Sequence, residues 1–154
     1  MAYSHGVIEE LTREEMDLLL ERSQYGRLGL AFENEAYVVP VSHIYDGQTI
    51  RFHISREGKK TTYLQANPLA CFEVDEWTER GWCSVICYGT VTLSDSVEAK
   101  REFLRLSGAA VLPDDQLERM EMYVCTLAIG EMTGRKGVGY SGQADNTQAS
   151  GVDG

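Results

Sequence analysis

Residues 49–60 read TIRFHISREGKK, a stretch that passes from a β-strand through a glycine-containing turn into the start of a helix. The backbone N–H groups at a helix N-terminus attract anions. Lys59 and Lys60 fall in the expected first turn, where positive charge opposes the helix dipole and is favourable only if an anion lies among these groups. The stretch therefore predicts a phosphate site, and a pair of solvated lysines is the ordinary alternative.

The segments before this stretch alternate between turn residues and short runs typical of β-strands. A capping box formed by Thr12 and Glu15 predicts a helix over residues 13–23. Strands are expected over residues 28–32, 37–45 and 49–54. The Asp46-Gly47 pair predicts a type I′ turn, in which both central residues take positive φ. Two hairpins in series would then form a meander.

The segments after this stretch continue the mixture of strands and helices. Helices are expected over residues 55–66, 97–106 and 114–122, the first of them ended by Asn67-Pro68. Strands are expected over residues 70–74, 82–93 and 123–131. Six or seven antiparallel strands with two or three flanking helices indicate a mainly β, α+β fold, a closed or partly closed barrel with its helices outside. A β-sandwich is the alternative.

Length and charge limit the domain count and the partners. With 154 residues, 43% of them hydrophobic, one core is sufficient, and we expect residues 1–136 to form one domain. Residues 137–154 are mostly small and polar, which predicts a flexible C-terminal tail. The net charge of -10 argues against nucleic acid and anionic membrane as partners. Because the N-terminus lacks the order of a signal peptide, a cytoplasmic location is expected.

Side chains able to bind metal or perform catalysis form no recognisable set. The four cysteines lie in segments that resemble buried strands and contain no CxxC pair: Cys71, Cys83, Cys87 and Cys125. We interpret them as small buried hydrophobes. No metal site is expected, because His5, His43 and His53 share no ligand spacing. His53 is either a hydrogen-bonded core residue or a group that faces a ligand. Difficult chemistry would therefore require a bound cofactor.

Five blocks of sequence follow one another in a characteristic order within residues 12–136. They are GRLGL (26–30), YVVPVSHIYDG (37–47), IRFHISREGKK (50–60) with LQANP (64–68), WCSVICYGTV (82–91) and IGEMTGRK (129–136). In this order they resemble the pyridoxamine 5′-phosphate oxidase-like split-barrel flavoproteins, and within them the branch of nitroimidazole-resistance reductases. The resemblance implies an antiparallel FMN-binding split barrel.

The resemblance also implies a cofactor and a set of residues that bind it. FMN would be held by its phosphate at Lys59 and Lys60, which occupy the position of an Arg-Lys pair in the family. His53, Ile54 and Ser55 would lie toward the ribityl-phosphate end. Further contacts are implied along the isoalloxazine ring and from a second subunit: Val39, Pro40, Val41 and Ser42 from one strand, and Ser84 from the partner. The resemblance therefore implies a homodimer with FMN at the subunit interface.

The expected function is that of an FMN-dependent oxidoreductase. A nicotinamide donor would supply electrons, and a small acceptor such as a nitro compound or a quinone would receive them. His53 is a candidate to face the substrate, and no other catalytic residue is assigned. True pyridoxamine phosphate oxidase activity is not expected, because residues 137–154 lack the Arg-x-His element of those enzymes. The alternative is a non-catalytic flavin- or haem-binding protein, a carrier, sensor or storage protein.

Overall fold

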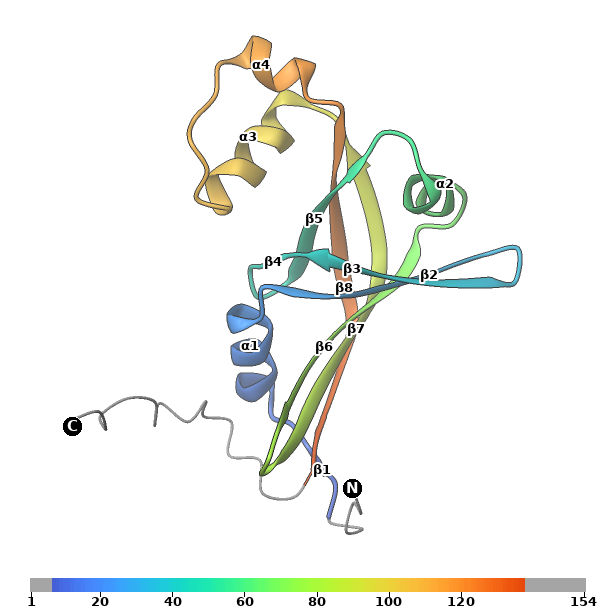
Figure 1. Cartoon of the computed structure of the whole chain (residues 1–154), viewed down its shortest axis with the longest axis vertical. Helices are drawn as coiled ribbons and strands as arrows, with labels where there is room; N and C mark the ends of the chain where they lie inside the picture. The colour runs from blue at the N-terminus through green and yellow to red at the C-terminus, as the bar shows by residue number, and fades with distance from the viewer. Residues whose placement is uncertain (1–6, 138–154) are drawn as a thin grey trace, which may run out of the picture.

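The computed structural model describes residues 7–137, which contain eight strands and four helices (Figure 1). The strands are β1 (Glu9–Glu10), β2 (Tyr25–Phe32), β3 (Glu35–Ser42), β4 (Ile44–Tyr45), β5 (Thr49–Ser55), β6 (Leu69–Thr78), β7 (Gly81–Ser94) and β8 (Met122–Lys136). The helices are α1 (Arg13–Arg22), α2 (Lys59–Ala66), α3 (Val97–Leu106) and α4 (Asp114–Arg119). Within residues 7–137, none of the helices is long and apolar enough to cross a membrane.

All strands belong to one antiparallel sheet with the order β3-β2-β6-β7-β8-β5-β4, and β1 pairs with the far end of β8. Only His43 separates β3 from β4, although these strands lie at opposite ends of the order. Because consecutive Cα atoms are about 3.8 Å apart, the sheet has to curl until its two ends meet. The mainly β barrel is confirmed, and the sandwich alternative and the simple meander are wrong.

Several element boundaries differ from the sequence prediction. The predicted strand over residues 37–45 is divided at His43 into β3 and β4. The predicted helix over 55–66 begins only at Lys59, because Ser55 still pairs with Met122 and Gly58 has φ +136°. The predicted helix over 114–122 stops at Arg119. The predicted strands over 70–74 and 123–131 are both longer in the structure. The predicted tail lies outside the described residues beyond Gly137.

The type I′ geometry occurs at a different turn from the one predicted. Glu33 and Asn34, between β2 and β3, have φ values of 50° and 63°. At the predicted turn, only Gly47 has positive φ. The carboxylate of Asp46 instead accepts hydrogen bonds from the backbone N–H groups of Gln48 and Thr49, at 3.0 and 2.7 Å. A side-chain-stabilised turn therefore replaces the tighter hairpin at this position.

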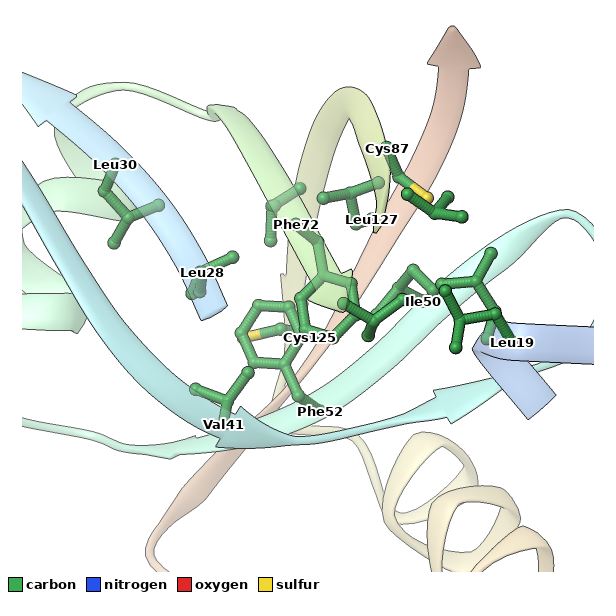
Figure 2. Close-up of a cluster of buried hydrophobic side chains, with 14 of the residues drawn as sticks. Leu19, Leu28, Leu30, Val41, Ile50, Phe52, Phe72, Cys87, Cys125 and Leu127 are labelled. Atoms are coloured by element: carbon green, nitrogen blue, oxygen red, sulfur yellow. The ribbon is translucent and has the colours of Figure 1, made fainter. Parts of the chain in front are cut away.

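The barrel interior is filled by alternate side chains of the long strands. On β5, Ile50, Phe52 and Ile54 point inward and are at most 2% exposed. In Figure 2, Val41 of β3 points toward Phe52, so side chains from the two ends of the sheet meet in one core. Leu19 belongs to the same cluster and anchors α1 against the barrel.

Three of the four cysteines are buried, as the sequence predicted. Cys83, Cys87 and Cys125 are buried, Cys71 is half-buried, and all four are free thiols. Burial raises the pKa of Cys87 and of Cys125 to about 12. Within the part of the chain that the structure describes, no group of three or more His, Cys, Asp or Glu side chains could hold a metal ion.

Helices α3 and α4 form a separate lobe over the outer face of the sheet (Figure 1). Phe103, Met122 and Val124 are the buried residues of a second small hydrophobic cluster beneath it. Lys100 of α3 is fully buried, and its ammonium donates hydrogen bonds to the carbonyl oxygens of Leu117 and Met120, at 3.0 and 2.9 Å. The same two carbonyl oxygens also accept from the backbone N–H groups of Met120 and Met122, so the lysine supplies each with a second donor and joins the end of α4 to α3.

Replacing Lys100 should loosen this lobe. Lys100→Met keeps the aliphatic stem but removes both hydrogen bonds of the ammonium, so that the carbonyl oxygens of Leu117 and Met120 keep only their backbone donors; this costs about 1–3 kcal/mol. For a protein of this size, each kcal/mol lowers the melting temperature by about 2–4 °C. Thermal unfolding followed by circular dichroism measures the change, with the exposed substitution Arg119→Met as control. Equal melting temperatures for Lys100→Met and its parent would contradict this role.

Candidate functional site

The outer face of β5 carries a polar stripe. Arg51, His53 and Ser55 alternate with the buried side chains and point away from the core. His53 and Ser55 are exposed, whereas Arg51 is half-buried and pairs with Asp46 at 3.2 Å. The predicted cofactor-binding residue Ile54 is 2% exposed and its side chain lies in the core. Only its backbone could therefore contact a ligand on the outer face.

Strand β3 forms one end of the sheet and pairs on one side only, with β2. Pro40 and Ser42 are exposed, Val39 is half-buried, and Val41 is 8% exposed in the core. On β5, only Ile50 and Arg51 pair with β4, so the residues from Phe52 onward lack a ladder partner on that side among the described residues. Two strand edges thus leave backbone groups available near the point where the barrel closes.

The N-terminus of α2 is not capped by a side chain. Its N-cap residue is Gly58, whereas α1 and α3 are capped by Thr12 and Ser96. The hydroxyl of Thr61 donates to the carbonyl oxygen of Ser55 and so ties the first turn of α2 to the end of β5. The first backbone N–H groups of α2 therefore lie directly after the polar stripe and remain available to an anion.

Lys59 and Lys60 have different surroundings. The Lys59 ammonium lies 4.6 Å from the ring centroid of Tyr37 and 3.6 Å from a carboxylate oxygen of Glu35. Lys60 is half-buried and has no hydrogen bond or ion pair with any residue that the structure describes. Its charge acts on the buried thiol of Cys125, partly opposing the rise in the pKa of that thiol caused by burial. Within the described part of the chain, Lys60 is therefore an unpaired positive charge at the start of α2.

The two histidines near the candidate site, His43 and His53, also differ in their surroundings. His43 lies at the link between β3 and β4, where Nε2 is 3.0 Å from the carbonyl oxygen of Leu20 and the ring packs on Phe72. Burial lowers the pKa of His43, which favours the neutral imidazole. His53 is exposed, its ring lies 5.5 Å from that of Phe103 between centroids, and its imidazole makes no hydrogen bond or ion pair within residues 7–137. His43 is a structural residue, and His53 is available to a ligand.

Ser84 lies far from the other predicted site residues within one chain. It stands on β7 opposite Asp75 of β6 and Arg135 of β8. His53 pairs with Val124 of β8, eleven residues before Arg135, and eleven residues of strand span about 36 Å. The structure thus brings together β3, β5 and α2, and Ser84 could reach such a site only from a second subunit.

A carboxyl pair on the outer face of β6 was not found by sequence reasoning. Glu73 and Asp75 share a single guanidinium, that of Arg27 on β2, whose Nη1 lies 3.6 Å from Glu73 and 3.2 Å from Asp75. Burial, and then the neighbouring Asp75, raise the pKa of Glu73 to about 7. The Glu-Val-Asp alternation at residues 73–75 is the only sequence signal, and Arg27 joins the pair through strand register.

This pair should make folding stability depend on pH. Because the folded protein holds the Glu73 proton more tightly than the unfolded chain does, its contribution to stability is full below the ordinary Glu pKa of about 4.3 and is lost as pH rises. That loss is complete above the folded pKa of about 7. Glu73→Gln, which cannot ionise, should therefore gain melting temperature relative to its parent as pH rises through this window. Parallel curves of melting temperature against pH for the two proteins would contradict the assignment.

Comparison with solved structures identifies the fold and names several flavin-binding proteins. A FAD-binding protein from Mesorhizobium loti is 26% identical, covering 85% of this chain and 97% of its own, with a TM-score of 0.67. A proposed 5-nitroimidazole antibiotic resistance protein from Bacteroides thetaiotaomicron is 19% identical, with 88% and 95% covered and a TM-score of 0.69. A FAD- and haem-binding protein from Mycobacterium smegmatis is 18% identical, with 87% and 75% covered and a TM-score of 0.68.

A search of curated proteins finds no match to this chain. The sequence profile of the family described as pyridoxamine 5′-phosphate oxidase matches residues 12–136, which include every described strand except β1 and all four helices. The chain belongs to the pyridoxamine 5′-phosphate oxidase-like family.

Proposed function

We propose that this protein is an FMN-dependent oxidoreductase that passes electrons from a nicotinamide donor to a small acceptor, such as a nitro compound or a quinone. The observation that carries the proposal is the half-buried Lys60, which has no partner among residues 7–137 and lies beside the N-terminus of α2, where no side chain caps the helix. The chain has a net charge of -10, and its other three lysines all have partners: Lys59 with Glu35, Lys100 with two carbonyls and Lys136 with Glu15. A half-buried cation without a partner is unfavourable unless an anion joins it.

The surrounding charges favour one phosphate over two. Lys59 pairs with Glu35, and Arg56 pairs with Asp95 at 3.3 Å. Glu57, in the same loop, adds a further negative charge. A phosphate next to Lys60 meets one uncompensated cation, whereas a second phosphate beyond it would meet paired or negative groups. We therefore propose FMN, although three of the similar structures are named as FAD-binding proteins.

The chain's own residues would bind and orient the cofactor. Lys60 and the N–H groups of α2 would hold the phosphate, and His53 and Ser55 would lie along the ribityl chain. The exposed edge of β3, from Val39 to Ser42, would contact the isoalloxazine ring through backbone groups. When bound, the flavin supplies the hydride chemistry, and the protein supplies position and a partly water-excluded surface.

A non-catalytic cofactor-binding protein is the second candidate. A similar structure from Mycobacterium smegmatis is named as a FAD- and haem-binding protein. In this chain, His53 is exposed and makes no hydrogen bond to the described residues, so its imidazole is available to a ligand. The same site could therefore store or sense a cofactor without turnover.

We further propose a homodimer with the site at its interface. Exposed apolar side chains gather on the outer face of the sheet, where strand alternation places them on one side: Tyr25, Val38, Leu69, Trp77 and Tyr88. Ser84 and the pair of Glu73 and Asp75 lie on this face as well. A second copy that covered this face would bury the apolar side chains and bring its own Ser84 near the cofactor.

Light scattering tests the dimer directly. The parent protein with FMN should give twice the chain mass of 17.2 kDa at micromolar concentration. Tyr88→Glu puts a charge at the proposed interface and should shift the mass toward one chain, because an unpaired charge is costly to bury. Arg119→Glu serves as the control, because α4 belongs to the lobe that packs at β4 and β8, whereas the exposed apolar side chains lie on β2, β3, β6 and β7. A single-chain mass for the parent would contradict the proposal.

Flavin titration tests the phosphate site. Lys60→Met removes a charged hydrogen bond to the phosphate, which contributes about 1.5–3 kcal/mol, and should weaken FMN at least tenfold. Riboflavin lacks the phosphate, so its affinity should change little. Lys59→Met is the matched control and should weaken FMN less, because Glu35 and Tyr37 already engage the Lys59 ammonium. Fluorescence quenching measures both flavins against the three proteins.

Three results would contradict the phosphate assignment or the cofactor. Equal FMN affinities for Lys60→Met and its parent would show that Lys60 is only a solvated charge. A colourless protein that ignores both flavins would remove the flavin proposal altogether. A Soret band in the absorption spectrum of the purified protein would favour the haem-binding alternative.

A further inference from the structure

The lobe of α3 and α4 has no part in the cofactor contacts proposed so far. It is nevertheless held firmly in place: Ser96 caps α3, and the buried Lys100 ties α3 to the end of α4. Beneath α3, the buried side chain of Phe103 packs with Met122 and Val124 of β8. The lobe is therefore fixed relative to the sheet and can hold a neighbouring side chain in position.

Phe103 contacts the imidazole of His53. Their ring centroids are 5.5 Å apart with an interplanar angle of 65°, an edge-to-face arrangement. The imidazole makes no hydrogen bond to any residue that the structure describes, so this aromatic contact is what orients it. His43, in contrast, is oriented by a hydrogen bond to Leu20. His53 is thus held through its ring while its nitrogens stay free.

The lobe is also tied to the loop that carries the phosphate site. Asp95, just before α3, pairs with Arg56 in the loop between β5 and α2. His53 and Ser55 share one face of β5, and two residues of strand span about 6.6 Å. Helix α3 therefore lies beside the segment that runs from the His53 imidazole, along the end of β5, to the N-terminus of α2.

We propose that Phe103 is a positioning residue, which holds the His53 imidazole with its nitrogens directed toward the ribityl-phosphate part of the flavin. This inference rests on the proposed function. Fixing a side chain before binding removes the entropy cost of ordering it in the complex. Without the Phe103 ring, His53 would sample several rotamers and its hydrogen bond to the flavin would contribute less to affinity.

A double-mutant cycle on FMN affinity tests this role. In the parent protein, His53→Ala should weaken FMN by about five- to tenfold, the value of one hydrogen bond. Phe103→Leu keeps the cluster apolar but removes the ring, and should weaken FMN about threefold or more. In the Phe103→Leu background, His53→Ala should then cost less than about twofold, because the imidazole is no longer positioned. Fluorescence quenching gives all four affinities.

Matched variants separate positioning from general loosening of the lobe. Met120→Leu alters the same cluster without touching His53, so His53→Ala should keep its full effect in that background. Phe103→Met provides a second removal of the ring if Phe103→Leu does not fold. A full His53 effect without the Phe103 ring, or no His53 effect in the parent, would overturn the inference. A parent that binds neither FMN nor riboflavin would instead contradict the proposed function.

Discussion

The structure depends on one short covalent link. Strands β3 and β4 belong to opposite ends of the sheet, but a single residue, His43, joins them. A flat sheet of seven strands would separate these ends by about 28 Å, at roughly 4.7 Å per strand spacing. The chain therefore has to close on itself, and closure sets Val41 of β3 against Phe52 of β5 inside the core (Figure 2). The same closure leaves the edge of β3 beside the unpaired part of β5, where the candidate site lies.

Charge pairing explains why few cationic side chains of this acidic protein are candidates to bind an anion. Most cations are already engaged, as in the pair of Arg22 with Glu76 and that of Lys136 with Glu15. Lys60 and His53 are exceptions that lie one after the other along β5 and α2. A polar group without a partner is costly when it is partly buried, so the half-buried Lys60 points to a ligand more strongly than its residue type alone.

Sequence reasoning predicted the elements that depend on local signals. The capping box at Thr12, the helix over residues 97–106 and the long strand near 82–93 all agree with the structure to within two residues. The division at His43 was missed, because the apolar alternation of residues 37–45 continues across the corner. The late start of α2 was missed as well, since the unusual backbone at Gly58 leaves no mark on composition.

The sequence predicted which residues belong to the candidate site, but it could not predict which of their side chains point outward. Alternation decides which of Val39 to Ser42 and which of His53 to Ser55 face outward, and it follows from register with β2 and β8. The different partners of Lys59 and Lys60, and the contacts of Arg27 with Glu73 and of His53 with Phe103, join residues far apart in the chain. Local patterns hold no information about such pairs. The cofactor contacts themselves stay a prediction.

The buried thiols have a consequence for how this protein can be studied. With pKa values of about 12 and no exposed sulfur, Cys87 and Cys125 are almost entirely un-ionised at neutral pH and beyond the reach of alkylating reagents in the closed barrel. They become reactive only when β7 and β8 separate. The rate at which a reagent labels them, after the faster half-buried Cys71, therefore reports how often the central strands open, and it needs no added probe.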